Sequence, residues 1–235
     1  MRLDVYLCKH SLAPSRAKAQ EMIASSLILL NHQVCTKNSY EVQETDLVQV
    51  CEQKIWVSRA GGKLEGFLQD VEVQIEGKRV LDIGSSTGGF SEVLLERGAS
   101  EIVCVDVGSN QLHPSLRHHP KITFFENTDI REFRDEGFEL VVCDVSFISL
   151  RLIFQSIFTL TLKDCILLFK PQFEVGREAK RDKKGVIKDL KVIEDSLRDF
   201  VAWIEGFGAK ILEVKKSKIK GKCGNEEYFI YWKKS

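Results

Sequence analysis

The sequence predicts an α/β protein with a Rossmann-like sheet and a smaller α+β module at its amino terminus. From Arg79 onward, short apolar runs alternate with amphipathic stretches, a pattern typical of a parallel sheet with helices on both faces. The first 50 residues lack this alternation. Because 235 residues can form a medium domain and a small one, we expect two domains, residues 1–57 and 58–235.

The amino-terminal module is expected to combine two short helices with short strands. The helices are predicted over residues 2–9 and 14–25, and Pro14 is expected to open the second one, in the first turn where proline is tolerated. Strand-like apolar runs follow at residues 27–30 and 47–50. We expect the linker to the second domain at residues 51–57.

The second domain is expected to alternate strands and helices. Its predicted parallel strands are residues 79–83, 101–107, 122–125, 139–144 and 165–169. Its predicted helices are residues 89–96, 114–118, 149–162 and 190–207. Two closing apolar runs, residues 211–214 and 228–232, favour a hairpin at an antiparallel edge of the sheet.

Composition excludes several classes of function. Lys plus Arg and Asp plus Glu number 34 each, so RNA affinity must come from local patches rather than from the net charge. No stretch approaches 18 apolar residues, and the first residues lack the apolar core of a signal peptide, so we expect a cytoplasmic protein without membrane contact. Neither the seven cysteines nor the five histidines show a metal-ligand spacing, and no metal is expected.

A glycine-rich loop, Gly84-Ser-Ser-Thr-Gly-Gly89, joins an expected strand to an expected helix. Glycines let the backbone approach a ligand closely, and Asp106, about 20 residues later at a strand end, suits ribose hydroxyls. The loop is neither the strict dinucleotide motif nor a P-loop, and Asp82 places a carboxylate where a pyrophosphate would lie. S-adenosylmethionine, which carries an ammonium group, fits this pattern, although such a turn is often only a tight connection. The candidate cofactor-binding residues are Asp82, Gly84, Ser85, Ser86, Thr87, Gly88, Gly89, Phe90 and Asp106, with Asp129 or Asn127 near the adenine.

The first 50 residues resemble an S4 RNA-binding domain. The resemblance is carried by Arg2-Leu-Asp4, Ser15-Arg-Ala-Lys-Ala-Gln20, Asn31 and Asp46-Leu-Val-Gln-Val50. It implies that Arg2, Lys9, Arg16 and Lys18 contact RNA phosphates, although each one alone is also typical of a solvated helix face. Ser26 and His32 stand where the family usually has glycine. Residues 1–52 hold five basic against six acidic side chains, so we expect weak affinity of this module alone.

The second domain resembles the FtsJ-like methyltransferases of class I, and the whole chain resembles the TlyA family of ribosomal RNA 2′-O-methyltransferases, also labelled hemolysin A. The resemblance is carried by Val57-Ser-Arg-Ala-Gly-Gly-Lys63-Leu, Leu81 to Phe90, Val105-Asp-Val-Gly108, Cys143-Asp-Val-Ser-Phe147, Phe169-Lys-Pro-Gln-Phe-Glu174 and Gly224-Asn-Glu-Glu-Tyr-Phe229. It implies S-adenosylmethionine as cofactor and ribosomal RNA or a ribosomal subunit as partner, with a cytidine of the large-subunit 23S RNA as target. The family's catalytic set falls on Lys63, Asp144, Lys170 and Glu227, with Glu226 as the alternative to the last.

The residue types of this catalytic set suit 2′-O-methylation. Three of the four stand where a strand or a glycine turn ends, and open α/β sheets bind ligands beyond the carboxyl ends of their strands. A ribose hydroxyl is a poor nucleophile, and a lysine can take its proton only in the neutral form. Burial lowers the pKa of a lysine, whereas neighbouring carboxylates raise it. Single lysines are mostly surface residues, but Lys170 directly follows an apolar run and is the strongest candidate.

Other features leave alternatives open. Two basic runs are either RNA-binding or solvated loops, namely Arg177, Lys180, Arg181, Lys183, Lys184 and Lys188, and then residues 215–222. Phe147 and Phe173 suit either a flipped base or the core. Alternative functions are a non-catalytic RNA-binding protein, a secreted cytolysin and a pseudouridine synthase. The intact catalytic set, the absence of a signal sequence or membrane-spanning run, and the glycine-rich loop argue against these three in turn.

Overall fold

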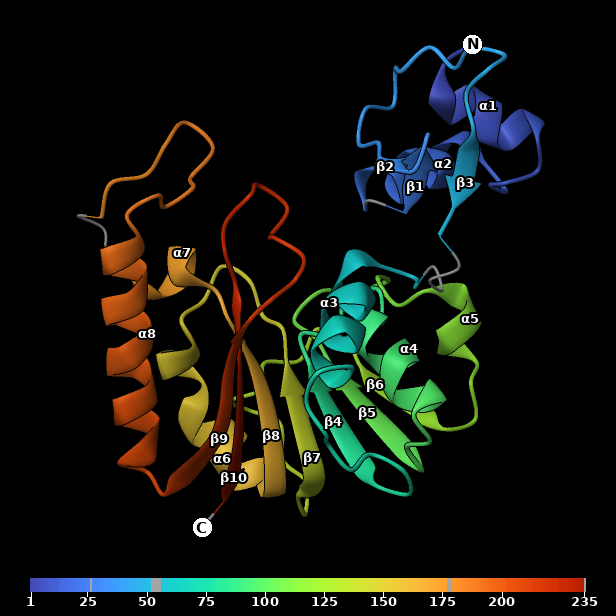
Figure 1. Ribbon diagram of the computed structural model, residues 1–235. Helices are drawn as coiled ribbons and strands as arrows, with labels where there is room; N and C mark the ends of the chain where they lie inside the picture. The colour runs from blue at the N-terminus through green and yellow to red at the C-terminus, as the bar shows by residue number, and fades with distance from the viewer. Residues whose placement is uncertain (26, 52–55, 177–178, 235) are drawn as a thin grey trace. The chain divides into compact units, whose positions relative to one another are not determined.

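A computed structural model of the chain describes residues 1–25, 27–51, 56–176 and 179–234. The chain is divided into two compact units, Met1–Ile55 and Trp56–Ser235 (Figure 1). The expected linker falls at this division, and its residues 52–55 lie outside the described residues. The two units are described separately below.

The amino-terminal unit combines two helices with a small antiparallel sheet within its described residues. Its elements are α1 (Leu3–Lys9), α2 (Arg16–Ala24), β1 (Ile28–Leu30), β2 (Gln33–Val34) and β3 (Val48–Val50), with strand order β2-β1-β3. Both predicted helices and both predicted strands are confirmed, while β2 was not predicted. Leu3, Leu7, Met22 and Ile28 form the centre of its core.

The predicted role of Pro14 is wrong. Helix α2 begins at Arg16, and Ser15 is its N-cap, whose side chain accepts a hydrogen bond from the Lys18 amide at 3.2 Å. Pro14 therefore precedes the cap and lies outside the helix. The serine is preferred at the cap because its hydroxyl satisfies a backbone N–H that the first turn leaves without a partner.

In the part of the chain that the structure describes, the second unit is built on a seven-stranded sheet of order β6-β5-β4-β7-β8-β10-β9. Its strands are β4 (Arg79–Ile83), β5 (Glu101–Val105), β6 (Ile122–Phe125), β7 (Phe138–Cys143), β8 (Thr161–Phe169), β9 (Ala209–Lys216) and β10 (Tyr228–Lys234). Strands β4 to β8 are parallel, and β10 is antiparallel to both β8 and β9. All predicted strands and the closing hairpin are confirmed, with small shifts of their ends.

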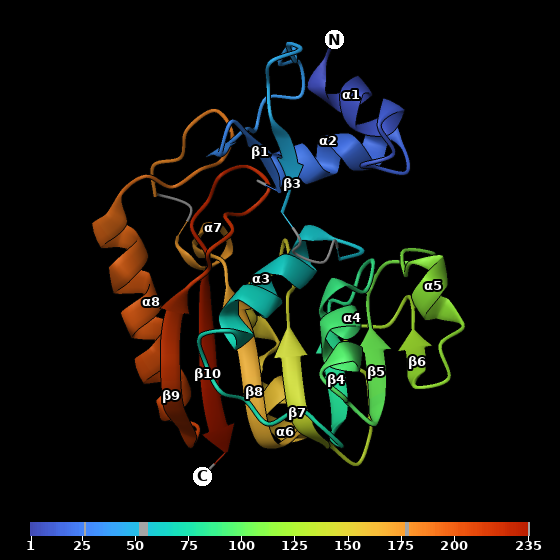
Figure 2. The ribbon, with the colours of Figure 1, turned by 45° about the vertical axis from the view of Figure 1, so that its right-hand side comes forward.

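Helices cover both faces of this sheet (Figures 1 and 2). They are α3 (Arg59–Leu68), α4 (Gly89–Glu96), α5 (Pro114–Arg117), the 3₁₀ helix η1 (Leu150–Leu152), α6 (Phe154–Leu160), α7 (Pro171–Glu174) and α8 (Leu190–Glu205). The helix predicted at 149–162 is divided into η1 and α6, and Thr161 and Leu162 belong to β8. Helices α3 and α7 were not predicted. The predicted Rossmann-like sheet is confirmed.

Two apolar layers hold this fold together, one on each face of the sheet. One layer contains Phe67 of α3 and Phe90 of α4, and the other contains Phe154 of α6 and Phe200 of α8. The strand order reverses its direction at β4, because β5 follows on one side and β7 on the other. Such a reversal opens a crevice beyond the carboxyl ends of the strands, which is where open α/β sheets bind ligands.

Candidate active site and cofactor cavity

A cavity of about 430 Å³ lies at the carboxyl ends of β4, β5 and β7. Its polar lining includes Gly84 and Ser86 after β4, Asp106 after β5, Asp129 after β6, and Asp144 after β7. Its apolar lining is formed by Ile83, Val105, Val107, Ile130, Val145, Phe147, Ile148 and Ile153. Apolar walls with a few convergent polar groups are typical of a small-molecule site of this size.

Four predicted cofactor residues line this cavity: Gly84, Ser86, Asp106 and Asp129. Gly84 has φ +75°, and a Cβ there would lie 2.9 Å from the Asp144 carbonyl oxygen, so only glycine allows this close turn. The Asp106 carboxylate accepts hydrogen bonds from the amides of Ser86 at 2.8 Å and Gly108 at 2.7 Å. These bonds hold the carboxylate at the cavity and leave it acceptor capacity for a ligand hydroxyl.

The other predicted cofactor residues lie outside the cavity lining: Asp82, Ser85, Thr87, Gly88, Gly89, Phe90 and Asn127. Phe90 is buried in the core beneath α4. Gly88 and Gly89 serve packing, because a Cβ on Gly88 would lie 2.3 Å from a Leu116 methyl and one on Gly89 would lie 2.1 Å from the Ser58 hydroxyl. The backbone N–H of Asn127 donates a hydrogen bond to the Gly108 carbonyl, so Asn127 shapes the turn and does not form part of the cavity wall.

Asp82 is buried below the turn and does not face the cavity as the sequence led us to expect. Its Oδ2 accepts a hydrogen bond from the Ser91 hydroxyl at 2.5 Å. Burial, with smaller contributions from the carboxylates of Asp144 and Asp106, raises the pKa of Asp82 to about 7. Asp129, in contrast, is bound by Arg131, which lowers the pKa of this carboxyl to about 2 and keeps it ionised at the cavity.

Cavity residues that sequence reasoning missed include Gly108, Gln111, Thr128 and Ser146. Each follows a parallel strand or lies in the loop after it. Their position relative to the strand ends was therefore the available signal, since the carboxyl ends of parallel strands meet at one edge of a sheet.

The buried Lys170 and the partly buried Asp144 form an ion pair beside the cavity. Lys170 follows β8 as the N-cap residue of α7, and its Nζ lies 2.5 Å from Asp144 Oδ1. The same Nζ donates a hydrogen bond to the Ser146 hydroxyl at 2.9 Å. Because Asp144 and Ser146 both line the cavity, the ammonium group of Lys170 is one contact away from a bound ligand.

Lys63 and Glu227 form a second buried ion pair, with Lys63 Nζ 2.7 Å from Glu227 Oε2. Lys63 does not follow a glycine turn as expected. It lies within α3, where Gly61 permits close contact with Trp56 and with the Gly89 carbonyl. Glu226 points elsewhere and binds Lys216 and Lys220 at the surface.

The two ion pairs lie at one end of the sheet. Phe169 of β8 pairs with Tyr228 of β10, so Lys170 and Glu227 are the next residues at neighbouring strand ends. The structure thus places all four predicted catalytic residues in two ion pairs around the carboxyl end of β8, with Asp144 after β7 and Glu227 before β10. Nearby, the Phe147 ring is 92% exposed and lies 5.4 Å from the Phe173 ring between centroids.

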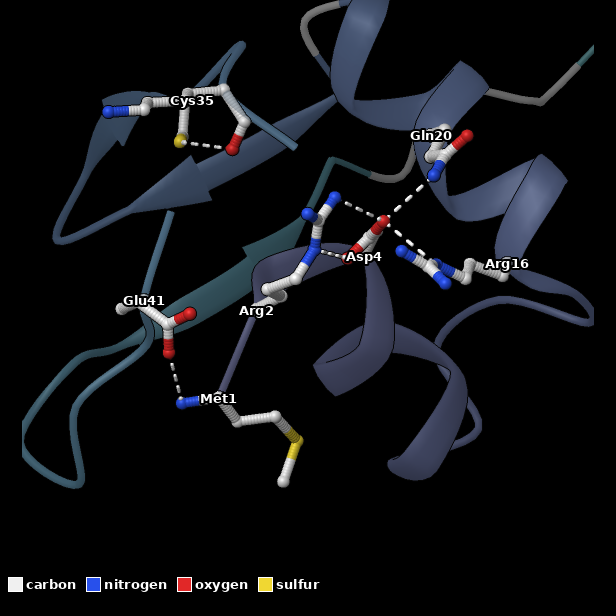
Figure 3. Close-up of polar contacts among 8 residues, drawn as sticks. Met1, Arg2, Asp4, Arg16, Gln20, Cys35 and Glu41 are labelled. Atoms are coloured by element: carbon white, nitrogen blue, oxygen red, sulfur yellow. Dashed lines mark hydrogen bonds and ion pairs between the residues drawn. The ribbon is translucent and has the colours of Figure 1, made fainter. Parts of the chain in front are cut away.

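In the amino-terminal unit, Arg2, Arg16 and Gln20 converge on Asp4 (Figure 3). Arg2 binds both carboxylate oxygens at 3.0 Å, Arg16 Nε lies 3.0 Å from Oδ2, and Gln20 Nε2 lies 2.8 Å from Oδ2. Asp4 is fully buried, and these bonds, above all those from Arg2, lower the pKa of its carboxyl despite its burial. The arginine side chains remain 42% and 57% exposed.

The other two predicted RNA-binding residues are arranged differently. Lys18 pairs with Glu21 along α2 at 3.2 Å, and Lys9 is exposed at the end of α1. The sequence motif contains Asp4 and Gln20, but no role was assigned to either. The available signal was the negative charge of Asp4 within a motif that also contains the basic residues Arg2 and Arg16, which could have identified Asp4 as their common partner.

The second basic run is partly balanced by acidic side chains. Lys215 and Lys218 form ion pairs with Asp70 at 3.0 and 2.8 Å. Two further lysines of this run are the ones that Glu226 binds. In the first run, Lys188 lies 3.3 Å from Asp182, and Arg177 is outside the described residues. Among the described residues, no cluster of three metal-ligating side chains occurs and no helix is long and apolar enough to cross a membrane.

Fold and site together define a Rossmann-like methyltransferase domain joined to a small RNA-binding module. The FtsJ-like methyltransferase model matches residues 56–234, and the S4 domain model matches residues 1–48. The chain therefore belongs to the FtsJ-like methyltransferases that carry an S4 domain, the TlyA family.

Three known proteins illustrate this similarity. The 23S rRNA (cytidine-2′-O)-methyltransferase TlyA of Campylobacter jejuni is 46% identical over 255 residues, and the match covers 100% of both chains. The 16S/23S rRNA (cytidine-2′-O)-methyltransferase TlyA of Mycobacterium tuberculosis is 36% identical, over 98% of this chain and 88% of the relative. A solved structure from Streptococcus thermophilus, described as a candidate hemolysin, has a TM-score of 0.75 and 31% identity, and covers 100% of this chain and 88% of that chain.

Proposed function

We propose that the protein transfers a methyl group from S-adenosylmethionine to the ribose 2′-oxygen of a cytidine in 23S ribosomal RNA. The observation that carries this proposal is the Lys170–Asp144 ion pair at the wall of the cavity. The name of the Campylobacter relative, which matches over its whole length, supports 23S RNA as the substrate. The Mycobacterium relative is named for both subunits, so 16S RNA is the alternative to be tested.

The cavity residues fit S-adenosylmethionine. Asp106 has the position and acceptor capacity to bind the ribose hydroxyls, and the apolar wall with Ile130 and Ile148 suits the adenine ring. Asp129 stays ionised at the β6 end of the cavity, where it and Thr128 provide polar contacts. The bound cofactor would supply a methyl group on a sulfonium, which is electrophilic enough to react with a ribose oxygen.

Lys170 is the residue that acts on the ribose hydroxyl. In its neutral form, Nζ would accept the 2′-hydroxyl proton, so that the ribose oxygen could react with the methyl group that the bound cofactor would supply. Asp144 and Ser146 hold Nζ in place before the reaction through the contacts at 2.5 and 2.9 Å. After proton transfer, the Asp144 carboxylate stabilises the ammonium group that forms.

Lys63 and Glu227 position the nucleotide at the same strand ends. Burying two opposite charges is costly unless they are well paired, and the close contact between Lys63 and Glu227 provides that pairing beside the substrate. The exposed ring of Phe147 offers a stacking surface for the target base. Arg2 and Arg16 in the S4 domain supply phosphate contacts that carry affinity but little sequence information.

Methylation mapping in ribosomal RNA from cells with and without the gene tests the substrate. Purified protein with labelled S-adenosylmethionine and ribosomal subunits tests the mechanism. We expect Lys170→Ala and Lys170→Arg to abolish transfer while cofactor and RNA binding persist, since a guanidinium does not give up its proton.

A matched control lies at the other end of the same strand. Lys163 forms an exposed pair with Glu139, and Lys163→Ala is expected to leave the rate unchanged. Near-normal turnover by Lys170→Arg would show that Lys170 only positions the substrate. Methylation that persists without the gene would refute the proposed substrate. For the RNA-binding role of the S4 domain, Arg16→Ala with Lys18→Ala is expected to weaken RNA binding and its salt dependence but not cofactor affinity.

A further inference from the structure

Two segments beyond the sheet are linked at several points. One is the loop of residues 144–150 after β7, and the other is residues 170–174, which include α7. At one end, Lys170 binds Asp144 and Ser146 as described. In the middle, the rings of Phe173 and Phe147 lie 5.4 Å apart between centroids, with their planes at 53°.

At the other end, Glu174 connects the same two segments. Its Oε2 accepts a hydrogen bond from the Ser149 hydroxyl at 2.7 Å, and its Oε1 accepts one from the Leu150 amide, also at 2.7 Å. Leu150 begins η1, so the carboxylate from α7 satisfies a backbone N–H at the start of another helix. Burial raises the pKa of Glu174, whereas both of these hydrogen bonds favour its ionised form.

Phe147 lies between these two attachments in an unfavourable backbone conformation. Its φ is +67°, a region that L residues with bulky side chains rarely adopt, and its ring is 92% exposed. Such a conformation persists only where surrounding contacts hold it. The loop is held by Ser146 on one side of Phe147 and by Ser149 and Leu150 on the other, and the second attachment depends on Glu174.

We propose that Glu174 is a positioning residue for the RNA substrate, because its carboxylate holds the loop in which Phe147 presents its ring to the target nucleotide. This inference rests on the proposed function of the same site. Glu174 does not line the cofactor cavity, so its effect on the reaction runs through the loop rather than through direct contact with the cofactor.

The first experiment compares Glu174→Ala with Glu174→Gln in the full-length protein. Alanine removes both hydrogen bonds. Glutamine keeps them, because its amide oxygen can accept from Leu150 while its NH₂ donates to the Ser149 hydroxyl. We expect Glu174→Ala to raise the KM for ribosomal subunits about tenfold, in the range of one lost base-stacking contact, and to raise the Kd for S-adenosylmethionine by a smaller factor, because Phe147 and Ile148 of the same loop also line the cavity. We expect near-normal constants for Glu174→Gln.

The second experiment tests whether Glu174 acts through Phe147. Phe147→Ala alone is expected to raise the KM for ribosomal subunits by about 5- to 150-fold, the range given by loss of base stacking. On that background, Glu174→Ala is expected to add less than a further twofold, since contacts that act as a unit are not additive. Equal factors for Glu174→Ala in both backgrounds would overturn the proposal. If Glu174→Ala does not fold, Ser149→Ala is used in its place, since it removes one of the two hydrogen bonds to Glu174.

A third measurement does not depend on enzymatic activity. With 4-fluorophenylalanine at position 147, the fluorine resonance is expected to shift or broaden in Glu174→Ala and to stay as in the parent in Glu174→Gln. An unchanged resonance in both variants would overturn the proposal even if methyl transfer occurs. A wild type that binds ribosomal subunits but transfers no methyl group would instead refute the proposed function and leave this structural test valid.

Discussion

Replacing Asp82 by asparagine tests how the buried acid below the glycine-rich turn contributes to the fold. The side chain is 1% exposed on β4, and Ser91 donates to its Oδ2. Its Oδ1 has no hydrogen-bond partner among the described residues. An ionised carboxylate in this setting would be a buried charge without an ion-pair partner, and burial accordingly raises the pKa of Asp82 to about 7.

The size and sign of the effect follow from this pKa. Asp82 holds its proton more tightly in the folded state than in the unfolded state, where the pKa is 3.8. Its contribution to stability is therefore complete below about pH 4 and is lost as the pH rises through about 7. At about 1.4 kcal/mol per pKa unit, the full shift corresponds to about 4 kcal/mol, more than half of which is lost between pH 5 and 8.

Urea unfolding at pH 5 and pH 8, followed by tryptophan fluorescence, measures this contribution. The buried Trp232 reports on the methyltransferase domain. We expect the free energy of unfolding of the wild type to fall by about 2 to 3 kcal/mol more than that of Asp82→Asn over this interval, because asparagine does not titrate. Equal pH dependence of the two proteins would refute the assignment of a protonated, buried Asp82.

The same variant decides between two roles for Asp82. The sequence favoured a contact between its carboxylate and the ammonium group of the cofactor, whereas the structure places it outside the cavity. If Asp82 serves the fold alone, calorimetric titration is expected to give Asp82→Asn a Kd for S-adenosylmethionine within about threefold of the wild type. A loss of a hundredfold or more, with the fold intact, would support the contact that the sequence suggested.

Four further perturbations have expected outcomes. Asp4→Asn leaves Arg2 and Arg16 without a carboxylate, and we expect it to destabilise the S4 domain by about 2 kcal/mol, the scale of lost charge-assisted hydrogen bonds. Hydrogen exchange of peptides from residues 1–50 measures this loss, and Glu44→Gln at an exposed position is the control. The wild-type S4 domain is expected to lose the same stabilisation on acidification below about pH 4, because its hydrogen bonds hold the pKa of Asp4 below its usual value. Gly84→Val is expected to abolish cofactor binding in calorimetry, since a Cβ there meets the Asp144 carbonyl, while Gly77→Val, with the same φ of +75° but open space, keeps it. Glu227→Gln is expected to lower methyl transfer at least a hundredfold and Glu226→Gln less than threefold; similar losses in both would contradict the assignment of Glu227 to the buried pair with Lys63.

Much of the fold could be predicted because the pattern of apolar runs reflects burial directly. Strands β4, β5 and β7 are nearly continuous apolar runs, as expected for a sheet covered on both faces. Helix α3 was missed because Gly61 and Gly62 lower helix propensity and suggest a turn. The structure shows why they are tolerated: Gly61 allows the helix to pack within reach of Trp56 and the Gly89 carbonyl. That packing is tertiary and leaves no local signal.

The cofactor residues were harder to predict than the strands. Within the run from Asp82 to Phe90, the motif alone does not separate residues that face a ligand from those that face the core. Gly84 and Ser86 face the cavity, whereas Phe90 points inward from α4 and Gly88 makes room for Leu116. The separation depends on the direction in which each side chain leaves the turn, which is set only when α4 and α5 pack against the sheet.

Burial of an ion pair is not by itself evidence for a catalytic role, as a third pair in this domain shows. Lys78 Nζ lies 2.6 Å from Asp164 Oδ2, and the Tyr231 hydroxyl donates to the same carboxylate at 2.9 Å. This pair is as buried as Lys170–Asp144, but it lies at the opposite end of the sheet, near the start of β4 and β8. Its polar atoms are satisfied within the core, so its removal would change stability rather than chemistry.

The Lys170–Asp144 pair differs in its surroundings rather than in its geometry. Asp144 and Ser146 line the cavity, and the exposed Phe147 follows them in a strained backbone conformation. An ion pair that only stabilises the fold is not made more stable by an adjoining cavity or by a solvent-exposed aromatic ring. The cost of desolvating Lys170 and Asp144 and the cost of straining Phe147 fall within one short loop, and substrate binding is the event that would use both.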